Sequence, residues 1–294
     1  MQREKQLLEK KAVTIAVYNQ KGGVGKTTTA FHLAVGLARA NKKVLIVDTD
    51  VQGNLTQNCG FIDKSLLKNS LAHLLQSVLN NIDEDKDELI TLPTEEILKQ
   101  TLELDGELTG ISLIPMGSDK KMNKIIKCIS VVAEDNEEYF IKTGLRSVLN
   151  EFDVIIIDCP SSFGISTTNA LVAADYVLVP MKPEFFSGKG IEGLVGIFND
   201  IRKKFNPKLK LAGILPTMVE CQYKSHQEVL GEIQAECDGK IKIFNSIIPK
   251  SSKIGQKQSE GSHILDEKRN KVADGYNNFV LEILEIIENW GFCK

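Results

Sequence analysis

Short apolar runs recur along the chain and alternate with stretches of helical period. The runs are rich in Val and Ile and lack regular polar positions, which is typical of strands buried on both faces of a sheet. They occupy residues 12–18, 43–48, 111–115, 152–159, 176–180, 209–217 and 241–249. Stretches of helical period lie between most of them, at 27–40, 65–79, 137–150, 189–205 and 225–236. This alternation predicts an α/β fold, a doubly wound, mostly parallel sheet flanked by helices.

The pattern contains no internal repeat and no linker rich in Gly, Ser or Pro. We therefore expect one domain, 1–294, because sheets of this class often exceed about 200 residues without dividing. Residues 1–11 form a charged N-terminal extension. The acidic segment 80–110 predicts a surface loop or insertion, with a short helix at 94–100.

Composition narrows the class of protein. With 36 Lys+Arg against 39 Asp+Glu the formal net charge is -3, so any contact with nucleic acid must come from a local patch. No apolar run approaches the roughly 18 residues of a membrane span, and the charged N-terminus lacks a signal-like apolar segment, so a cytoplasmic location is expected. The six cysteines form no C-x-x-C pair, which favours reduced thiols over a metal-thiolate site.

Residues 19–29, NQKGGVGKTTT, nearly match the phosphate-binding loop G-x-x-x-x-G-K-[ST]. The segment joins the first predicted strand to the first predicted helix, which is the context that such a loop requires. Its glycines let backbone N–H groups converge on phosphate oxygens. Lys26 is expected to neutralise the β- and γ-phosphates, and the Thr27 hydroxyl to bind Mg²⁺. ATP and Mg²⁺ are thus the expected cofactors, held by Gly22, Gly23, Val24, Gly25, Lys26, Thr27 and Thr28.

Aspartates mark the ends of two predicted strands. Asp48 closes one run and Asp50 begins the loop after it, whereas Asp158 closes the run at 152–159. Ligands of open α/β sheets bind at the carboxyl ends of strands, so one or both acids of the first pair are expected beside the phosphates. The apolar run that ends at Asp158 is typical of a Walker B strand, which carries a carboxylate to the Mg²⁺ shell.

Five segments together resemble a known family. KGGVGKTTT, VLIVDTDVQGNLT, DVIIIDCPSS, VPMKPEFFSGKG and IIPKSSKIG follow the order and spacing of the ParA branch of the deviant Walker A ATPases. The resemblance extends over residues 12–287. This family includes plasmid and chromosome partition ATPases and MinD-type positioning ATPases. The resemblance implies an ATPase that acts as a molecular switch in DNA partitioning.

The resemblance also implies roles for single residues. Lys21, the extra lysine of the loop, matches one that reaches the triphosphate of a partner subunit, which implies a homodimer in the ATP state. Asp50 matches the acid that orients the attacking water, so Lys21, Lys26 and Asp50 are the expected catalytic residues. Asp48 and Asp158 match carboxylates near the Mg²⁺ shell. The segment at Pro249 and Lys250 matches a loop that closes over the adenine.

The sequence departs from the family pattern at two positions. Val51 replaces a proline that usually follows the second acid, and Ser161 replaces the second proline of D-C-P-P-S. Because proline fixes φ, both changes are expected to loosen these segments without removing a catalytic group.

In ParA relatives the ATP dimer binds double-stranded DNA without sequence preference, and a ParB-like centromere-binding protein stimulates hydrolysis and release. The resemblance therefore implies a nucleoid-associated protein. Such binding is phosphate neutralisation, for which a few cations suffice. The expected DNA-binding residues are Lys224, Lys250, Lys253 and Lys257.

A MinD-like or cargo-positioning ATPase, which acts on a membrane or a protein assembly, is the alternative. The last segment, 276–294, has an apolar stripe of Phe279, Val280, Ile283, Leu284, Ile287 and Trp290. Glu282, Glu285 and Glu288 occupy its other side, and acidic residues repel anionic lipid. The stripe is therefore expected to pack against the sheet, with no membrane contact.

Overall fold

A computed structural model describes residues 12–61, 70–82, 110–117, 119–132, 137–185, 189–220, 228, 231, 234–235, 241–259 and 262–290. The strands are β1 (Val13–Val17), β2 (Val44–Asp48), β3 (Ile111–Ile114), β4 (Val154–Asp158), β5 (Tyr176–Met181), β6 (Lys210–Val219) and β7 (Ile248–Pro249). The helices are α2 (Lys26–Arg39), α3 (Asn54–Asn58), α4 (Leu71–Ile82), α6 (Asp119–Val132), α7 (Phe140–Leu145), α8 (Ile165–Ala173), α9 (Lys189–Lys204), α11 (Lys253–Ser259) and α12 (Lys271–Trp290). Two short 3₁₀ turns are η3 (Arg146–Val148) and η4 (Pro183–Phe185).

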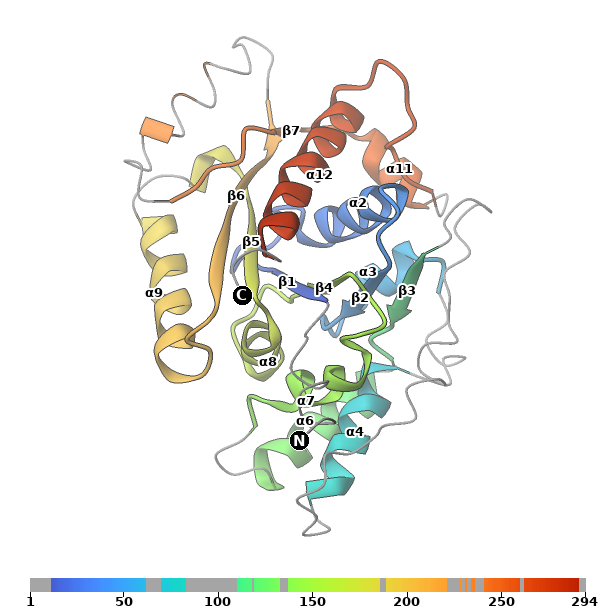
Figure 1. Cartoon of the computed structure of the whole chain (residues 1–294), viewed down its shortest axis with the longest axis vertical. Coiled ribbons are helices and arrows are strands. Elements are labelled where there is room, and N and C mark those ends of the chain that lie inside the picture. Colours follow the sequence, from blue (N-terminus) through green and yellow to red (C-terminus); the bar gives the residue numbers. More distant parts are fainter. Residues whose placement is uncertain are drawn as a thin grey trace.

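The strands form one sheet in the order β3-β2-β4-β1-β5-β6-β7 (Figure 1). Every strand pair within the described residues is parallel. The doubly wound α/β fold is therefore confirmed. The first strand of the chain lies in the middle of the sheet, so the loop that follows it has strand ends on both sides.

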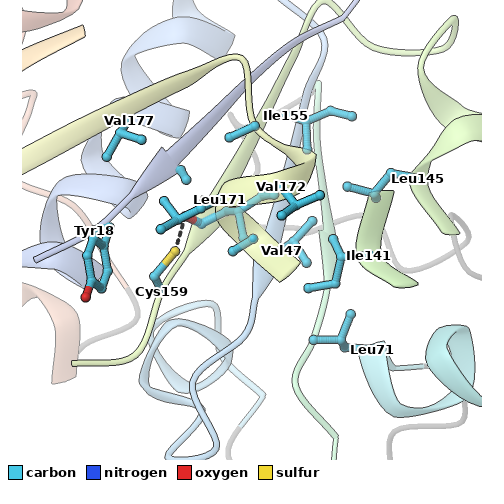
Figure 2. Close-up of a cluster of buried hydrophobic side chains, with 14 of the residues drawn as sticks. Tyr18, Val47, Leu71, Ile141, Leu145, Ile155, Cys159, Leu171, Val172 and Val177 are labelled. Atoms are coloured by element: carbon cyan, nitrogen blue, oxygen red, sulfur yellow. Dashed lines mark hydrogen bonds between the residues drawn. The ribbon is translucent and has the colours of Figure 1, made fainter. Parts of the chain in front are cut away.

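Two apolar cores cover the two faces of the sheet. One lies under α2 and α12, where Phe31, Leu37, Phe279 and Ile283 are fully buried. The other lies under α4, α6, α7, α8 and α9. Figure 2 shows part of this second core, in which Leu171 and Val172 of α8 lie among strand residues such as Ile155. Because both faces are covered, β1, β2 and β4 are buried along their whole length, as their continuous apolar runs predict.

The segment 241–249 differs from the predicted strand. Only Ile248 and Pro249 form β7, together with an isolated bridge between Ile214 and Ile243. Between them, the backbone N–H groups of Asn245 and Ser246 donate to the Glu282 carboxylate of α12, at 2.9 and 2.8 Å. The ladder is interrupted because a side chain takes these donors.

The C-terminal stripe packs as expected in its described part. Phe279, Val280 and Ile283 are buried in the core beneath α12, where the helix contacts α2 and β7. Within the described ranges, no helix has both the length and the apolar character needed to cross a membrane. The N-terminal extension 1–11, most of the segment 80–110 with its predicted helix at 94–100, and most of the predicted helix 225–236 lie outside the described residues.

Candidate nucleotide-binding site

The glycine-rich loop connects β1 to α2 and has the backbone that its sequence predicts. Gly23 and Gly25 have φ values of 65° and 85°, in the left-handed region that favours glycine. Gly25 stands at the N-cap of α2, so the first turn of the helix begins directly at Lys26 and Thr27. The unpaired N–H groups of a helix start carry partial positive charge and suit an anion.

The two lysines of the loop lie in opposite environments. Lys26 is only 7% exposed, and its Nζ donates to the carbonyl of Lys21 at 3.1 Å and to Oγ of Ser161 at 2.7 Å. Burial lowers the pKa of Lys26, while Asp158, Cys159 and Asp50 oppose this shift. The side chain of Lys21 is exposed at the mouth of the loop.

Two residues that the sequence reasoning missed hold the loop in place. Asn19 donates through Nδ2 to the carbonyl of Pro180 at 2.8 Å and accepts from the N–H of Lys21 at 3.0 Å. Thr217, in β6, donates to the carbonyl of Val24 at 2.8 Å. Each lies at or just beyond the carboxyl end of an apolar run, which is the signal that could have identified them.

Asp48 and Asp158 are both fully buried and occupy the same register position on the neighbouring strands β2 and β4. Asp48 accepts from the N–H of Asp50 at 3.1 Å, and from the N–H and hydroxyl of Thr56 at 2.8 and 2.6 Å. Burial raises its pKa to about 6, against these hydrogen bonds. Asp48 thus closes the loop between β2 and α3, and its predicted place near Mg²⁺ stays a prediction.

Asp158 has the opposite surroundings. Neither of its buried carboxylate oxygens has a hydrogen-bond partner among the described residues. Burial, with the Asp48 carboxylate as the second cause, raises its pKa well above the usual range, whereas the Thr27 hydroxyl and Lys26 lower it. A buried carboxylate that lies beside the Thr27 hydroxyl and has no hydrogen bond of good geometry fits a hard divalent cation. No cluster of three or more His, Cys, Asp or Glu side chains suited to a metal occurs in the described ranges.

Asp50 lies beside this group at the start of the loop after β2. It is half-buried, and its carboxylate accepts from the N–H of Gln52 at 3.0 Å. Its charge opposes the lowered pKa of Lys26 and adds to the raised pKa of Asp158. Asp50, Lys26 and Asp158 therefore interact electrostatically, and their shared action on one phosphate chain stays a prediction.

Helix α2 is tied to the region of α11. The hydroxyl of Thr28 accepts from Nε2 of Gln258 at 3.4 Å. His32 is fully buried and stacks on Tyr276, with 4.7 Å between ring centroids. Its Nδ1 lies 2.8 Å from the carbonyl of Thr28, and its Nε2 accepts from the N–H of Ile264 at 3.4 Å, so the ring is neutral with the proton on Nδ1.

The candidate DNA-binding lysines lie toward the C-terminal end of the chain. Lys250 follows β7 and pairs with Glu220 at 2.6 Å. Lys253 and Lys257, on α11, lie 3.5 and 3.7 Å from the carboxylate of Glu267. Lys224 lies outside the described residues. The structure thus brings two of the four lysines to one acidic partner, and it places Pro249 and Lys250 at the sheet edge beside β6.

Comparison with known proteins agrees with this geometry. The AAA domain family model AAA_31 matches residues 12–211. The chromosome partitioning protein ParA of Myxococcus xanthus is 34% identical over 251 residues, which are 85% of this chain and 80% of that one. The chromosome-partitioning ATPase Soj of Thermus thermophilus is 33% identical over 262 residues, 88% and 89% of the two chains. The chain belongs to the ParA/Soj family of ATPases. The recognised resemblance and the predicted ATPase class are both confirmed.

A solved relative extends the ParA/Soj comparison to the nucleotide. Cobyrinic acid a,c-diamide synthase from Mycobacterium smegmatis, with bound ATP analogue and magnesium, is 29% identical, and the match covers 93% of this chain and 94% of that one. The TM-score is 0.73. That protein binds nucleotide and magnesium on the same fold, which is consistent with the use of both in the ParA/Soj family.

Proposed function

We propose that this ParA/Soj-family ATPase is an ATP-dependent DNA partition switch. In the ATP state two chains form a homodimer that holds double-stranded DNA without sequence preference, over the nucleoid. A ParB-like centromere-binding partner stimulates hydrolysis, and the protein releases the DNA. Such a switch holds its ATP state until it is triggered, so hydrolysis without the partner is slow.

The contrast between the two loop lysines carries this proposal. Lys26 is buried and bound within its own loop, whereas Lys21 is exposed five positions earlier at the mouth. An exposed cation beside a phosphate loop is well placed to serve the triphosphate of a second subunit. This arrangement supports a face-to-face dimer in which each chain completes the other's site.

Within the site, each residue has a distinct task. Lys26 neutralises the outer phosphates, and the helix-start N–H groups hold the inner ones. Asp50 orients the attacking water, and Lys21 of the second subunit stabilises charge that develops during transfer. Thr27 and Asp158 would hold Mg²⁺, which neutralises phosphate charge when bound. Pro249 and Lys250 close over the adenine.

The lysines near α11 support the DNA part of the proposal. Lys253 is exposed and Lys257 is half-buried on α11. Gln258 of the same helix donates to the hydroxyl of Thr28 in α2. A shift of Thr28 on ATP binding would therefore act on α11 through the hydrogen bond to Gln258. DNA bound there contributes phosphate contacts, which make affinity fall steeply with salt.

Retention on random-sequence duplex DNA tests the proposal, with ATP, with ADP and without nucleotide, across a salt series. Retention only with ATP, weakening steeply with salt, supports it. The variant Lys253→Ala is expected to flatten the salt slope by about 0.9. Lys124→Ala, an exposed lysine on α6 over the other face of the sheet, serves as the matched control.

Absence of retention in every state, from protein that binds ATP, would overturn the DNA function. ATP-dependent binding to anionic liposomes in the same series would favour the MinD-like alternative instead. Equal loss of retention in Lys253→Ala and Lys124→Ala would remove α11 from the DNA-binding surface.

A further inference from the structure

Ser161 lies beside the phosphate loop, in the segment that follows β4. Its Oγ accepts from Nζ of Lys26 at 2.7 Å. The same oxygen lies 3.7 Å from the position that a Cβ on Gly22 would take. The hydroxyl therefore stands between the end of the Lys26 side chain and the first glycine of the loop. A proline, usual at this position in the ParA pattern, has no donor or acceptor in its side chain.

The O–H of Ser161 is free to donate a hydrogen bond. A hydroxyl has a single O–H and two lone pairs, and an ammonium group can only donate. The Ser161 oxygen must therefore accept from Lys26, which leaves its own proton to donate elsewhere. Within the part of the chain that the structure describes, that O–H donates to no other group. An oxygen that accepts from a cation is polarised, so its O–H becomes a stronger donor.

The place of this donor along a bound nucleotide follows from the loop. In a phosphate loop, backbone N–H groups hold the inner phosphates, and the lysine reaches outward to the β- and γ-phosphates. A hydroxyl at the outer end of the lysine, on the side of Gly22, would therefore face the terminal phosphate of a bound nucleotide. Anionic oxygen is the acceptor that such a donor prefers.

We propose that Ser161 is a further substrate-contacting residue, whose hydroxyl donates to the γ-phosphate oxygen that Lys26 neutralises. The site then distinguishes ATP from ADP more strongly than the same site with proline. This inference rests on nucleotide use by the loop and is independent of whether the switch acts on DNA.

Equilibrium binding of a non-hydrolysable ATP analogue and of ADP, each with Mg²⁺, tests the proposal. A hydrogen bond to a charged group contributes about 1.5–3 kcal/mol. Ser161→Ala is therefore expected to lower the affinity for the ATP analogue by about 10- to 150-fold. Its affinity for ADP is expected to change by less than about twofold, which also shows that the variant is folded. Ser161→Thr keeps the hydroxyl and is expected to bind the analogue as tightly as the parent protein does. Ser161→Pro has no hydroxyl and is expected to behave as the alanine variant.

The neighbouring exposed serine provides the matched control. Ser162 contributes its carbonyl to Thr167 at 2.8 Å, and Ser162→Ala is expected to leave both affinities unchanged. Equal weakening of the analogue and ADP in Ser161→Ala would assign the residue to loop structure and overturn the proposal. Unchanged binding of the analogue in Ser161→Ala, or failure of Ser161→Thr to restore it, would overturn it as well.

Discussion

The carboxylates of Asp48 and Asp158 stand side by side at the ends of β2 and β4, yet the described residues donate hydrogen bonds only to Asp48. Two aspartates that are equally buried thus have different roles. Asp48 holds a loop in place, while Asp158 retains its full capacity to accept. This division separates a structural acid from a candidate cation ligand within one pair.

Exchange of each acid for its amide tests this division. Asp48→Asn replaces one of the two acceptor oxygens by an NH₂ group, so at least one of the three donors loses its acceptor, and the variant is expected to lower the free energy of unfolding by about 1–3 kcal/mol. Asp158→Asn replaces a buried carboxyl group whose pKa burial raises well above the usual range, so the protein in EDTA is expected to melt at the same or a higher temperature. In that variant, the factor by which Mg²⁺ raises nucleotide affinity is expected to be at least about tenfold smaller than in the parent protein. A melting temperature as low as that of Asp48→Asn would show that Asp158 has a structural partner.

The two loop lysines are expected to separate binding from turnover. Lys26→Ala removes the buried cation of the loop and is expected to abolish nucleotide binding. Lys21→Ala is expected to keep ATP affinity and lose hydrolysis, and Asp50→Ala to keep ATP and trap the dimer. Equilibrium nucleotide binding, steady-state hydrolysis and size-exclusion chromatography with ATP measure these effects. Loss of ATP affinity in Lys21→Ala would contradict a role across the dimer, and normal hydrolysis in Asp50→Ala would remove that acid from the mechanism.

The protein is expected to lose stability in acid because His32 is buried in its neutral form. Burial lowers its pKa to about 4 in the folded chain, against about 6.5 in the unfolded chain. The unfolded state therefore binds the proton first, and the contribution of neutral His32 is complete above about pH 6.5 and is lost as the pH falls toward 4. Nearby His263 adds to this shift. The loss is on the order of 3 kcal/mol.

Chemical denaturation between pH 7 and 4 measures the effect of His32. The decline is expected to be shallower in His32→Gln than in the parent protein. His73→Gln removes another histidine of lowered pKa that is only half-buried, and it is expected to keep most of the parent slope. Identical slopes for the parent and His32→Gln would show that His32 does not titrate in this window.

Glu267 is expected to reduce DNA binding, because it lies within 3.7 Å of both Lys253 and Lys257. Exposed ion pairs are worth under about 1 kcal/mol each, so Glu267→Gln is expected to raise DNA affinity in the ATP state by up to about fivefold. Glu285→Gln makes the same change of charge at an exposed position of α12 and serves as the control. An equal rise in both variants would reflect net charge alone.

Gly36 permits the close approach of α2 and α12. A Cβ at this position would lie 2.3 Å from Cγ2 of Val280. Gly36→Ala is therefore expected to destabilise the protein by about 1–3 kcal/mol, although alanine favours a helix. Val280→Ala removes the clashing methyl groups, so the double variant is expected to be more stable in urea than Gly36→Ala. Stabilisation by Gly36→Ala alone would mean that α12 readily moves away.

The central strands and the phosphate loop were predictable because their signals are local. Val154–Asp158 is a continuous apolar run that ends in an acid, and burial on both faces produces that pattern. Lys26 and Thr27 follow glycines at a strand-to-helix boundary, where the backbone itself forms the site. The ParA/Soj assignment followed from the order of such segments.

Other features depend on contacts between distant residues. Helix α8 was not predicted, because its buried position 169 holds a polar residue. Asn169 accepts from the N–H of Ile141 and donates to the carbonyl of Glu137. The bond between Lys26 and Ser161 joins residues 135 positions apart, and the sequence predicted only a looser segment at Ser161. Apolar spacing cannot reveal a helix with a polar inner face or a contact between the start of a helix and a distant loop.

The central position of β1 also has a consequence for synthesis on the ribosome. Val13 pairs with Val154 and Ile15 with Tyr176, so β1 waits on the ribosome for partners that are synthesised much later. The last helix, α12, then covers α2. Long-range parallel pairing of this kind forms slowly and leaves apolar strands exposed meanwhile. A nascent chain that lacks β4 and β5 therefore has the whole phosphate-loop sequence without the fold that supports it, so nucleotide binding is expected only after these strands have been made.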